Sequence, residues 1–323
     1  MNIKKTLPII IFIMGPTASG KTKMVFHLSK ILPIDIISVD SGLIYRDMNI
    51  GTDKPSTQDL VKYPHKLVNI RDPIDIYSVE DFRNNALYEI NKIVFNKRIP
   101  VLVGGTMFYY KSLLHGLASL PSTSYVIRSN LYQNFKDVEN AILYQYLKKI
   151  DNEASLKIHP NNIKKILRVI EIFLVSGKNL TTYLKSEKDF YCFPYKVLQF
   201  FVMPFNRTVL HNRISARFKK MLDIGFEEEV KNLFYRGDLN PHLPSMQRVG
   251  YRQMWSYLSN KCSYDDMIFQ SICATRQLAK KQITWSKKWD NLFILNSENF
   301  DFSIDIISKM ISKYIKNNFF FYK

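Results

Sequence analysis

The chain has 323 residues, of which 46% are hydrophobic and 14% aromatic, and this composition excludes general disorder and predicts a large buried core. Its formal net charge of +18, from 46 basic and 28 acidic residues, indicates a polyanionic partner, with nucleic acid as the first candidate. The sequence is rich in Lys, Ile and Asn throughout, so the location of the charge is more informative than its sum.

The cysteines and the N-terminal apolar run bear on the cellular compartment. Cys192, Cys262 and Cys273 lie far apart and form no Cys-x-x-Cys pair, so we expect neither a zinc site nor a disulfide framework, and a cytoplasmic, reducing environment. Residues 9–14 are apolar but too few to span a membrane, and they lead into a glycine-rich loop. We therefore predict no membrane anchor and no signal peptide.

The first predicted strand, residues 7–14, is followed by a glycine-rich loop and then by the start of an amphipathic helix. Strand, Gly-x-x-x-x-Gly-Lys-Thr and helix are typical of a P-loop, in which successive backbone N–H groups bind phosphate oxygens. Lys21 adds a positive charge, the helix N-terminus adds its dipole, and the Thr22 hydroxyl is a candidate ligand for Mg²⁺. The predicted phosphate-binding residues are Gly15, Pro16, Thr17, Ala18, Ser19, Gly20, Lys21 and Thr22.

A second buried strand is predicted over residues 34–39, and it ends beside Asp40 and Ser41. Because ligands of open α/β sheets bind at the carboxyl ends of strands, we expect Asp40 in the same crevice as the P-loop. An aspartate at a strand end often only caps the next turn. Beside a P-loop, however, its position suits a general base or a group that orients an acceptor.

The next segments continue an alternation of strands and helices. Residues 67–70 are predicted as a weak third strand, and Ser78-Val79-Glu80-Asp81 as a capping box that starts a helix ending near Lys97. A fourth strand at residues 100–103 ends in Gly104-Gly105-Thr106, where an ATPase or GTPase would carry a metal-binding aspartate. This difference argues against nucleotide hydrolysis as the main activity. The alternation predicts an α/β fold with a doubly wound parallel sheet of the P-loop NTPase-like class.

The second half of the chain is mostly helical. Residues 122–188 are helical and basic, whereas residues 197–203 return to the sheet. We therefore predict a P-loop α/β core in residues 1–120, an inserted helical domain in 121–195, and a return to the core with C-terminal helices in 196–323. Helices are predicted at residues 207–222, 226–236, 264–285 and 304–315, and a late strand at residues 291–295.

Basic residues recur on the predicted helices at spacings that place several on one face. One charged helix face is usually only solvated. Several such faces, interleaved with Tyr251, Trp255 and Trp285, fit a structured RNA better than a small metabolite. The clusters are Lys164, Lys165 and Arg168; Arg213, Arg217, Lys219 and Lys220; Arg248 and Arg252; and Arg276, Lys280, Lys281, Lys287 and Lys288.

Short motifs extend from the P-loop to about residue 290. They are Gly15–Thr22, Ser38-Val39-Asp40-Ser41, Gly51-Thr52-x-Lys54-Pro55, Val103-Gly104-Gly105-Thr106, Ile158-His159-Pro160-Asn161, Gly225-Phe226 with Glu229-Val230, Val249-Gly250-Tyr251-Arg252-Gln253, and Thr275-Arg276-Gln277-x-Ala279-Lys280-x-Gln282-x-Thr284-Trp285. Together they resemble the bacterial tRNA dimethylallyltransferases, the MiaA family. The final thirty or so residues carry no signature.

The resemblance implies a reaction and its participants. A dimethylallyl group would move from dimethylallyl diphosphate to N6 of the adenosine 3′-adjacent to the anticodon, in tRNAs that read codons beginning with U, and diphosphate would leave with Mg²⁺ present. Asp40 would be the general base, and Thr106 and Arg217, with Arg213 as the rival alignment, would steady the diphosphate and the reacting centre. A tRNA-sized substrate needs only a monomer.

The resemblance also implies a set of tRNA contacts. They are Asp40, Ser41, Gly42, Leu43, Thr106, Arg128, Lys164, Lys165, Ile166, Leu167, Arg168, Ser245, Met246, Gln247, Arg248, Val249, Gly250, Lys280, Lys281, Gln282, Ile283, Thr284, Trp285, Ser286 and Lys287. The chain departs from the family pattern at four places. Gly42 stands where Ala or Met is expected, Asn162 in place of Asp, and Lys165 in place of Arg, while the arginine expected at position 247 stands at 248.

Three other functions fit parts of the pattern. A P-loop kinase would use Lys21 on ATP and Asp40 on a hydroxyl acceptor, but the basic C-terminal helix and the Gly-Gly-Thr strand end argue against it. A prenyltransferase for free adenine nucleotides would need neither the many basic faces nor the insertion. A non-catalytic RNA-binding protein would be expected to lose Lys21 or Asp40, and both are present.

Overall fold

The computed structural model describes residues 7–118, 120–121, 130–131, 133–135, 137–186 and 192–317, with side chains up to residue 315. Arg128 lies outside the described residues. The chain divides into two compact units, which we call the α/β unit (Met1–Leu114 and Phe193–Lys323) and the inserted unit (His115–Cys192).

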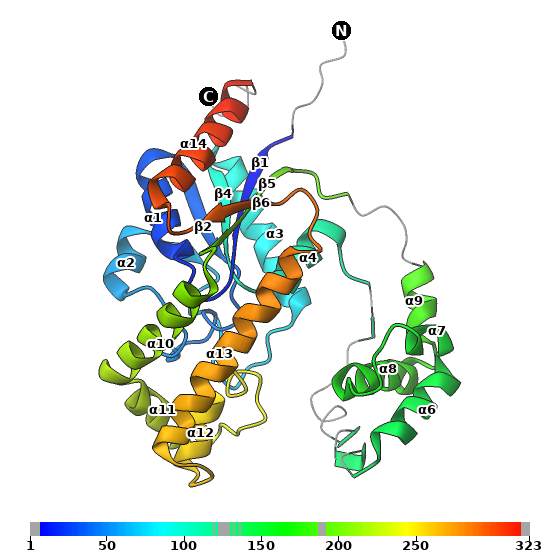
Figure 1. Cartoon of the computed structure of the whole chain (residues 1–323). Helices are drawn as coiled ribbons and strands as arrows, with labels where there is room; N and C mark the ends of the chain where they lie inside the picture. Colours follow the sequence, from blue (N-terminus) through cyan, green and yellow to red (C-terminus); the bar gives the residue numbers. More distant parts are fainter. Residues whose placement is uncertain are drawn as a thin grey trace. The chain divides into compact units, whose positions relative to one another are not determined.

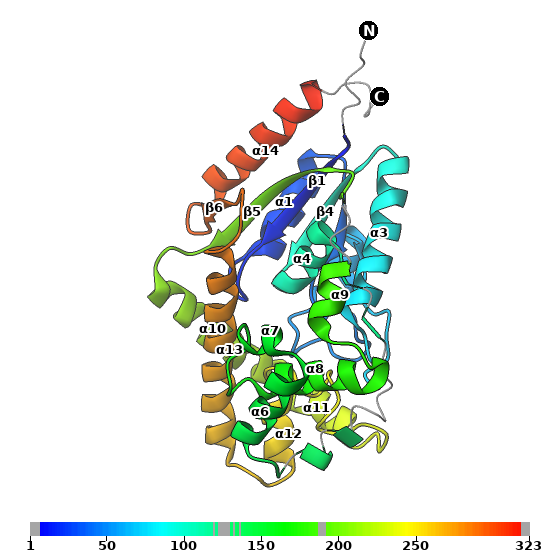
Figure 2. The same cartoon turned by 90° about the vertical axis from the view of Figure 1, so that its right-hand side faces the viewer.

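The α/β unit is built on a six-stranded sheet in the order β3-β2-β4-β1-β5-β6, in which every pairing is parallel (Figures 1 and 2). The predicted doubly wound α/β fold is thus confirmed. The strands are β1 (Ile9–Met14), β2 (Ile34–Ser38), β3 (His65–Lys66), β4 (Ile99–Gly104), β5 (Lys196–Met203) and β6 (Phe293–Asn296).

The strand predicted at residues 67–70 is wrong. The third strand is only His65–Lys66, which pairs with Ile36 and Ile37 of β2. Leu67 and Asn69 have φ angles of 61° and 57°, in the left-handed region, so the chain turns where an extended strand was expected.

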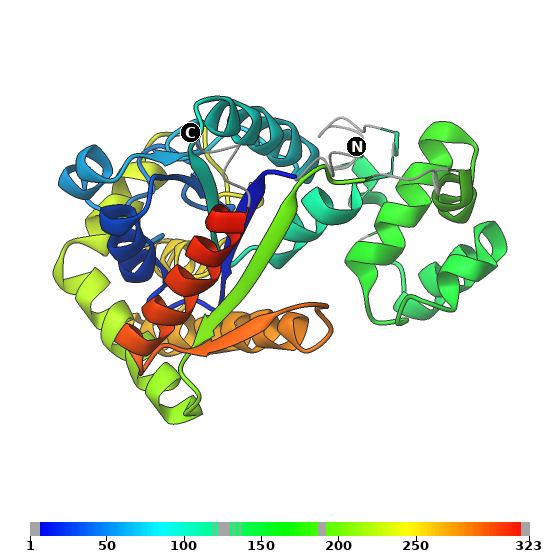
Figure 3. The same ribbon diagram turned by 90° about the horizontal axis from the view of Figure 1, so that it is seen from above.

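Helices cover both faces of the sheet (Figure 3). The capping box at Ser78 is confirmed, since the Asp81 N–H donates to the Ser78 hydroxyl and the Ser78 N–H donates to the Asp81 carboxylate. The short helices α2, α4 and α12 were not predicted. The helices are α1 (Lys21–Ile31), α2 (Thr57–Lys62), α3 (Val79–Phe95), α4 (Met107–His115), α10 (Arg207–Asp223), α11 (Phe226–Phe234), α12 (Tyr251–Leu258), α13 (Tyr264–Ser286) and α14 (Phe300–Asn317).

Alternate residues of β1 belong to two different hydrophobic cores. Ile9, Ile11 and Ile13 pack with α1 and α14, whereas Ile10 and Phe12 pack with α3 and α4. Every residue of β1 and β4 is buried, as expected for central parallel strands. The carboxyl ends of these strands are therefore rigid supports for the loops that follow them.

The inserted unit has a small core of its own. Its helices are α6 (Asn140–Ile150), α7 (Asn152–Ser155), α8 (Ile163–Ser176) and α9 (Leu180–Ser186). Leu147 of α6 and Ile166 and Ile170 of α8 are fully buried in this core. The buried Asp151 carboxylate accepts hydrogen bonds from the Ala154 N–H at 3.0 Å and the Thr181 hydroxyl at 2.9 Å, which ties the start of α7 to α9.

Candidate active site

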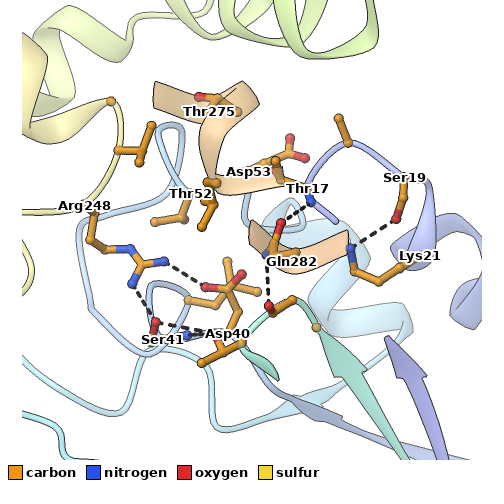
Figure 4. Close-up of a pocket in the computed structure, with 18 of the residues that line it drawn as sticks. Thr17, Ser19, Lys21, Asp40, Ser41, Thr52, Asp53, Arg248, Thr275 and Gln282 are labelled. Atoms are coloured by element: carbon orange, nitrogen blue, oxygen red, sulfur yellow. Dashed lines mark hydrogen bonds and ion pairs between the residues drawn. The ribbon is translucent and has the colours of Figure 1, made fainter. Parts of the chain in front are cut away.

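A pocket of about 670 Å³ lies at the carboxyl ends of β1, β2 and β4 (Figure 4). The P-loop, the segment from Asp40 to Asp53, the Gly104-Gly105-Thr106 turn and helices α10 and α13 all contribute to its lining. The prediction placed Asp40 and the P-loop in one crevice, and the structure brings them together. The volume falls in the usual range of small-molecule binding sites, about 300–1,000 Å³.

The P-loop is fixed at both of its ends. At its start, a Cβ atom on Gly15 would overlap the Val202 carbonyl of β5, so only glycine allows the two strands to pack this closely. At its end, Gly20 has a φ of 89° and α1 begins at Lys21. The loop can therefore present its N–H groups to an anion at the helix N-terminus.

Lys21 is held inside this loop. Its Nζ donates to the Pro16 carbonyl at 2.6 Å and to the Ser19 hydroxyl at 3.2 Å. Loss of water around the ammonium lowers the pKa of Lys21 to about 7, although Asp40 raises this pKa and Arg217 lowers it further. An anion in the loop would favour the charged form of Lys21.

Asp40 follows β2 and faces the pocket. Its Oδ1 accepts the Gly42 N–H at 2.8 Å and Nη2 of Arg248 at 3.1 Å. Arg248 also donates through Nη1 to the Ser41 hydroxyl at 2.8 Å. Among the described residues, Oδ2 of Asp40 has no hydrogen-bond partner, so one oxygen is anchored and the other can accept a proton.

Thr106 lies beside Asp40 because two strand ends pack closely. A Cβ atom on Gly104 would overlap the backbone of Val39, and the Thr106 N–H donates to the Val39 carbonyl at 3.2 Å. The Thr106 hydroxyl accepts the Ser41 N–H at 3.2 Å. This turn connects the end of β4 to the segment that carries Asp40.

The structure distinguishes the two candidate arginines of α10. Nη1 of Arg217 donates to the Thr17 hydroxyl of the P-loop at 2.8 Å and lies 3.3 Å from the Asp53 carboxylate. Arg213 instead donates to the Ser297 hydroxyl and does not line the pocket. Arg217 is therefore the arginine placed beside the phosphate loop.

Gln282 of α13 has a place that the sequence did not reveal. It was expected to contact tRNA, but the side chain is buried and both of its amide atoms are engaged inside the protein. Its Oε1 accepts the Thr17 N–H at 3.0 Å, and its Nε2 donates to the Gly105 carbonyl at 2.9 Å (Figure 4). It thus joins the P-loop to the turn that carries Thr106.

Glu229 of α11 belongs to the Gly225-Phe226 motif, and its contacts were not predicted from the sequence. Its carboxylate accepts the N–H groups of Asn49, Ile50 and Gly51 at 2.6–3.0 Å, together with the Tyr251 hydroxyl. These bonds hold the irregular segment that brings Asp53 to Arg217.

The residues expected to contact tRNA divide into exposed and buried side chains. Six of them have buried side chains, although Gln282 also lines the pocket, and their contact with tRNA stays a prediction: Ile166, Leu167, Ser245, Met246, Gln282 and Ser286. Arg168 is partly exposed and pairs with Glu171 at 2.6 Å. The exposed members are Lys164, Lys165, Gln247, Lys280, Lys281, Thr284, Trp285 and Lys287. Ser41, Gly42, Leu43, Arg248, Val249 and Gly250 lie at or near the pocket, and Ile283 is partly buried against the hydrophobic core.

Two hydroxyls could take part in metal binding. Thr22 is exposed in the first turn of α1, and the buried Ser38 hydroxyl has no hydrogen-bond partner among the described residues. Ser38 continues the face of β2 on which Ile34 and Ile36 pack against α1. The part of the chain that the structure describes contains no cluster of three His, Cys, Asp or Glu side chains suited to a metal. It also contains no helix long and apolar enough to cross a membrane.

This chain matches one protein-family model and several solved structures. The IPP transferase family model matches residues 43–289. The chain is similar to the tRNA isopentenylpyrophosphate transferase of Bacillus halodurans, with 31% identity over 97% of this chain and 98% of that one and a TM-score of 0.70. The chain is also similar to the tRNA isopentenylpyrophosphate transferase of Staphylococcus epidermidis, with 31% identity over 95% of this chain and 99% of that one and a TM-score of 0.67. A eukaryotic dimethylallyltransferase acting on tRNA shares the fold, with 23% identity over 96% of this chain and 80% of that one and a TM-score of 0.79.

Proposed function

The chain belongs to the IPP transferase family of tRNA prenyltransferases, and from this we propose that it transfers a dimethylallyl group from dimethylallyl diphosphate to N6 of the adenosine 3′-adjacent to the anticodon. The observation that carries the proposal is the pairing of a phosphate loop and Asp40 in one pocket, without a carboxylate at the end of β4. A pocket of this kind favours group transfer to an acceptor over hydrolysis of a nucleotide.

In the proposed reaction, the N6 nitrogen attacks C1 of the dimethylallyl group while the allylic C–O bond breaks. The electron pair of that bond leaves with diphosphate. The lone pair of the adenine amine is delocalised into the ring, so N6 must lose a proton as the new C–N bond forms. Asp40 would accept this proton at Oδ2, the carboxylate oxygen that faces the pocket without a partner among the described residues.

The residues at the phosphate loop would stabilise the charge that develops on diphosphate. Backbone N–H groups of the loop would donate to its oxygens, and Lys21 would add a full positive charge. Arg217, which contacts the Thr17 hydroxyl, would supply a second charge from α10. Thr106, whose hydroxyl contacts the Ser41 N–H, would steady the acceptor side.

The residues present fit Mg²⁺, which would be held by the Thr22 hydroxyl, with the unpartnered Ser38 hydroxyl available to a metal-bound water. Mg²⁺ commonly binds few protein ligands, together with substrate phosphates and waters, so the lack of an acidic cluster among the described residues is compatible with it. When bound, Mg²⁺ would supply positive charge to the diphosphate oxygens.

We further propose that the exposed basic side chains of α8 and α13 contact tRNA, and that the protein acts as a monomer in the cytoplasm. The target adenosine must leave the anticodon-loop stack to reach the pocket, at a cost of about a few kcal/mol. Arg128, outside the described residues, stays in the predicted contact set.

The test is a transfer assay with purified protein, Mg²⁺ and labelled dimethylallyl diphosphate, run in parallel on a tRNA that reads codons beginning with U, the same tRNA with guanosine at the target position, and AMP. Label should enter only the first tRNA. Label in AMP alone would identify a nucleotide prenyltransferase. A separate incubation with ATP and a hydroxyl acceptor would identify a kinase if ATP were consumed.

A further inference from the structure

The guanidinium of Arg248 occupies the space in which a side chain at position 42 would lie. A Cβ atom on Gly42 would be 2.6 Å from Cζ of Arg248, far closer than two carbon atoms can approach. The φ angle of Gly42 is not in the left-handed region, so its backbone does not itself require glycine. The absence of a side chain at position 42 therefore leaves room for the guanidinium where it now lies.

The space is used to anchor Asp40. Through Nη2, Arg248 donates to Oδ1 of Asp40, the same oxygen that accepts the Gly42 N–H, and through Nη1 it donates to the Ser41 hydroxyl. Two donors on Oδ1 restrict rotation of the carboxylate. Oδ2 is thereby presented to the pocket.

The backbone of Arg248 is well placed for this task. The Ser245 hydroxyl donates to the Pro73 carbonyl, and Met246 is fully buried, which fixes the turn before Arg248. After it, the Gly250 N–H donates to the Gln253 side chain at the start of α12. The arginine thus reaches Asp40 from a rigid turn.

We propose that Arg248 is a positioning residue for Asp40 and that the missing side chain at Gly42 admits it. This inference rests on the proposed function, because it takes Asp40 to be the general base. It also connects two departures from the family pattern, since the glycine at position 42 and the arginine at position 248 fit together in space. Arg248 therefore acts on the acceptor step and not on RNA affinity.

The test combines Arg248→Ala, Gly42→Ala and the double variant in the transfer assay, with tRNA affinity and the KM for dimethylallyl diphosphate measured separately. Each single variant should lower kcat about tenfold, a part of the roughly 10²–10⁴-fold contribution of a general base. In the double variant, Gly42→Ala should have no further effect, because the guanidinium that its Cβ displaces is already gone. Both binding parameters should stay within about twofold of wild type.

Arg98→Ala is the matched control. Arg98 forms the same kind of pair, at 2.7 Å, with Asp35 at the start of β2, the end of the strand remote from Asp40. Its removal should leave kcat unchanged. Arg248→Lys, which keeps the charge but replaces two donor nitrogens by one, should restore part of the loss.

Two outcomes would overturn the inference. If Arg248→Ala raises the Kd for tRNA and leaves kcat unchanged, Arg248 is an RNA contact. If Gly42→Ala lowers kcat by the same factor in the Arg248→Ala background as in wild type, the glycine does not act by making room for the arginine. A wild-type protein that transfers no label to tRNA would instead refute the proposed function.

Discussion

At the phosphate end of the pocket the geometry is set mainly by the backbone and by the buried side chain of Gln282, whereas at the acceptor end it depends on a pair of side chains carried by two loops. The P-loop follows a fully buried strand, and Thr17 is held at its N–H by Gln282 and at its hydroxyl by Arg217. The side chains of Asp40 and Arg248 remain 34% and 26% exposed and meet across two loops.

This difference separates two tasks. A rigid loop binds an anion without paying for rearrangement, and its contribution grows as charge develops on the leaving group. A carboxylate on a loop can be aligned with an acceptor that arrives on a large RNA. We therefore expect substitutions at the phosphate end to change donor binding and transfer together, and substitutions at the acceptor end to change transfer alone.

The largest expected effect is that of Asp40→Ala. Transfer to tRNA should fall on the order of 10³-fold, because the other carboxylate that lines the pocket among the described residues, Asp53, is paired with Arg217 at the phosphate loop. Affinity for diphosphate, measured by calorimetry, should change by less than about twofold. Asp35→Ala, at the other end of β2, is the control. Loss of diphosphate binding in the Asp40 variant would erase the distinction between the two ends.

Lys21→Met should have the next largest effect. The methionine side chain has a similar length but no charge, so kcat/KM should fall about 10²-fold, the size expected for one electrostatic contact in the transition state. The KM for dimethylallyl diphosphate should rise as well, while the Kd for tRNA stays constant. If the KM of Lys21→Met for dimethylallyl diphosphate equals that of wild type, Lys21 does not contact the diphosphate.

Most strands of the sheet can be predicted from the sequence alone. The apolar runs that became β1, β2 and β4 are strands whose residues are nearly all buried, and β5 is buried over residues 199–202, so composition identifies them. The strand β3 could not be found in this way. It has two residues, both polar or charged, and exists only because the chain passes beside β2.

The residues of the candidate site also divide into those that the sequence predicts and those that it does not. The P-loop and Asp40 lie in short local patterns with a known physical role. The partners of Gln282 are Thr17 and Gly105, far from it in the sequence, and no periodicity distinguishes it from the exposed Lys281 beside it. Ile166 and Leu167 entered the contact set because the resemblance implies residues 164–168 as one run, although their apolar character by itself predicts the buried position that they occupy.

Gln282→Met tests the buried connection between α13 and the phosphate loop. Methionine keeps the shape but removes both the acceptor for the Thr17 N–H and the donor to the Gly105 carbonyl. We expect the donor KM to rise by at least about tenfold, because two hydrogen bonds worth about 0.5–1.5 kcal/mol each are lost, with tRNA affinity unchanged. Gln270→Met makes the same change on the exposed surface of α13 and should be silent. Weaker tRNA binding in the Gln282 variant would return this residue to the RNA contacts.

The smallest expected effect is a coupling between donor binding and pH. The pKa of Lys21 is lowered to about 7 in the free protein, chiefly because burial removes water from the ammonium, with Asp40 and Asp53 acting in the opposite direction and Arg217 in the same one. A bound diphosphate favours the charged form and raises this pKa, so binding takes up a proton above pH 7. Affinity should therefore decline about fivefold from pH 7 to pH 8, since the fraction of Lys21 that must be protonated grows with pH.

Calorimetry in two buffers of different ionisation enthalpy measures the uptake directly. The same titration of Lys21→Met should show a nearly flat profile, and if the slope persists in that variant, the proton is taken up by another group and the phosphate end is not organised around this lysine.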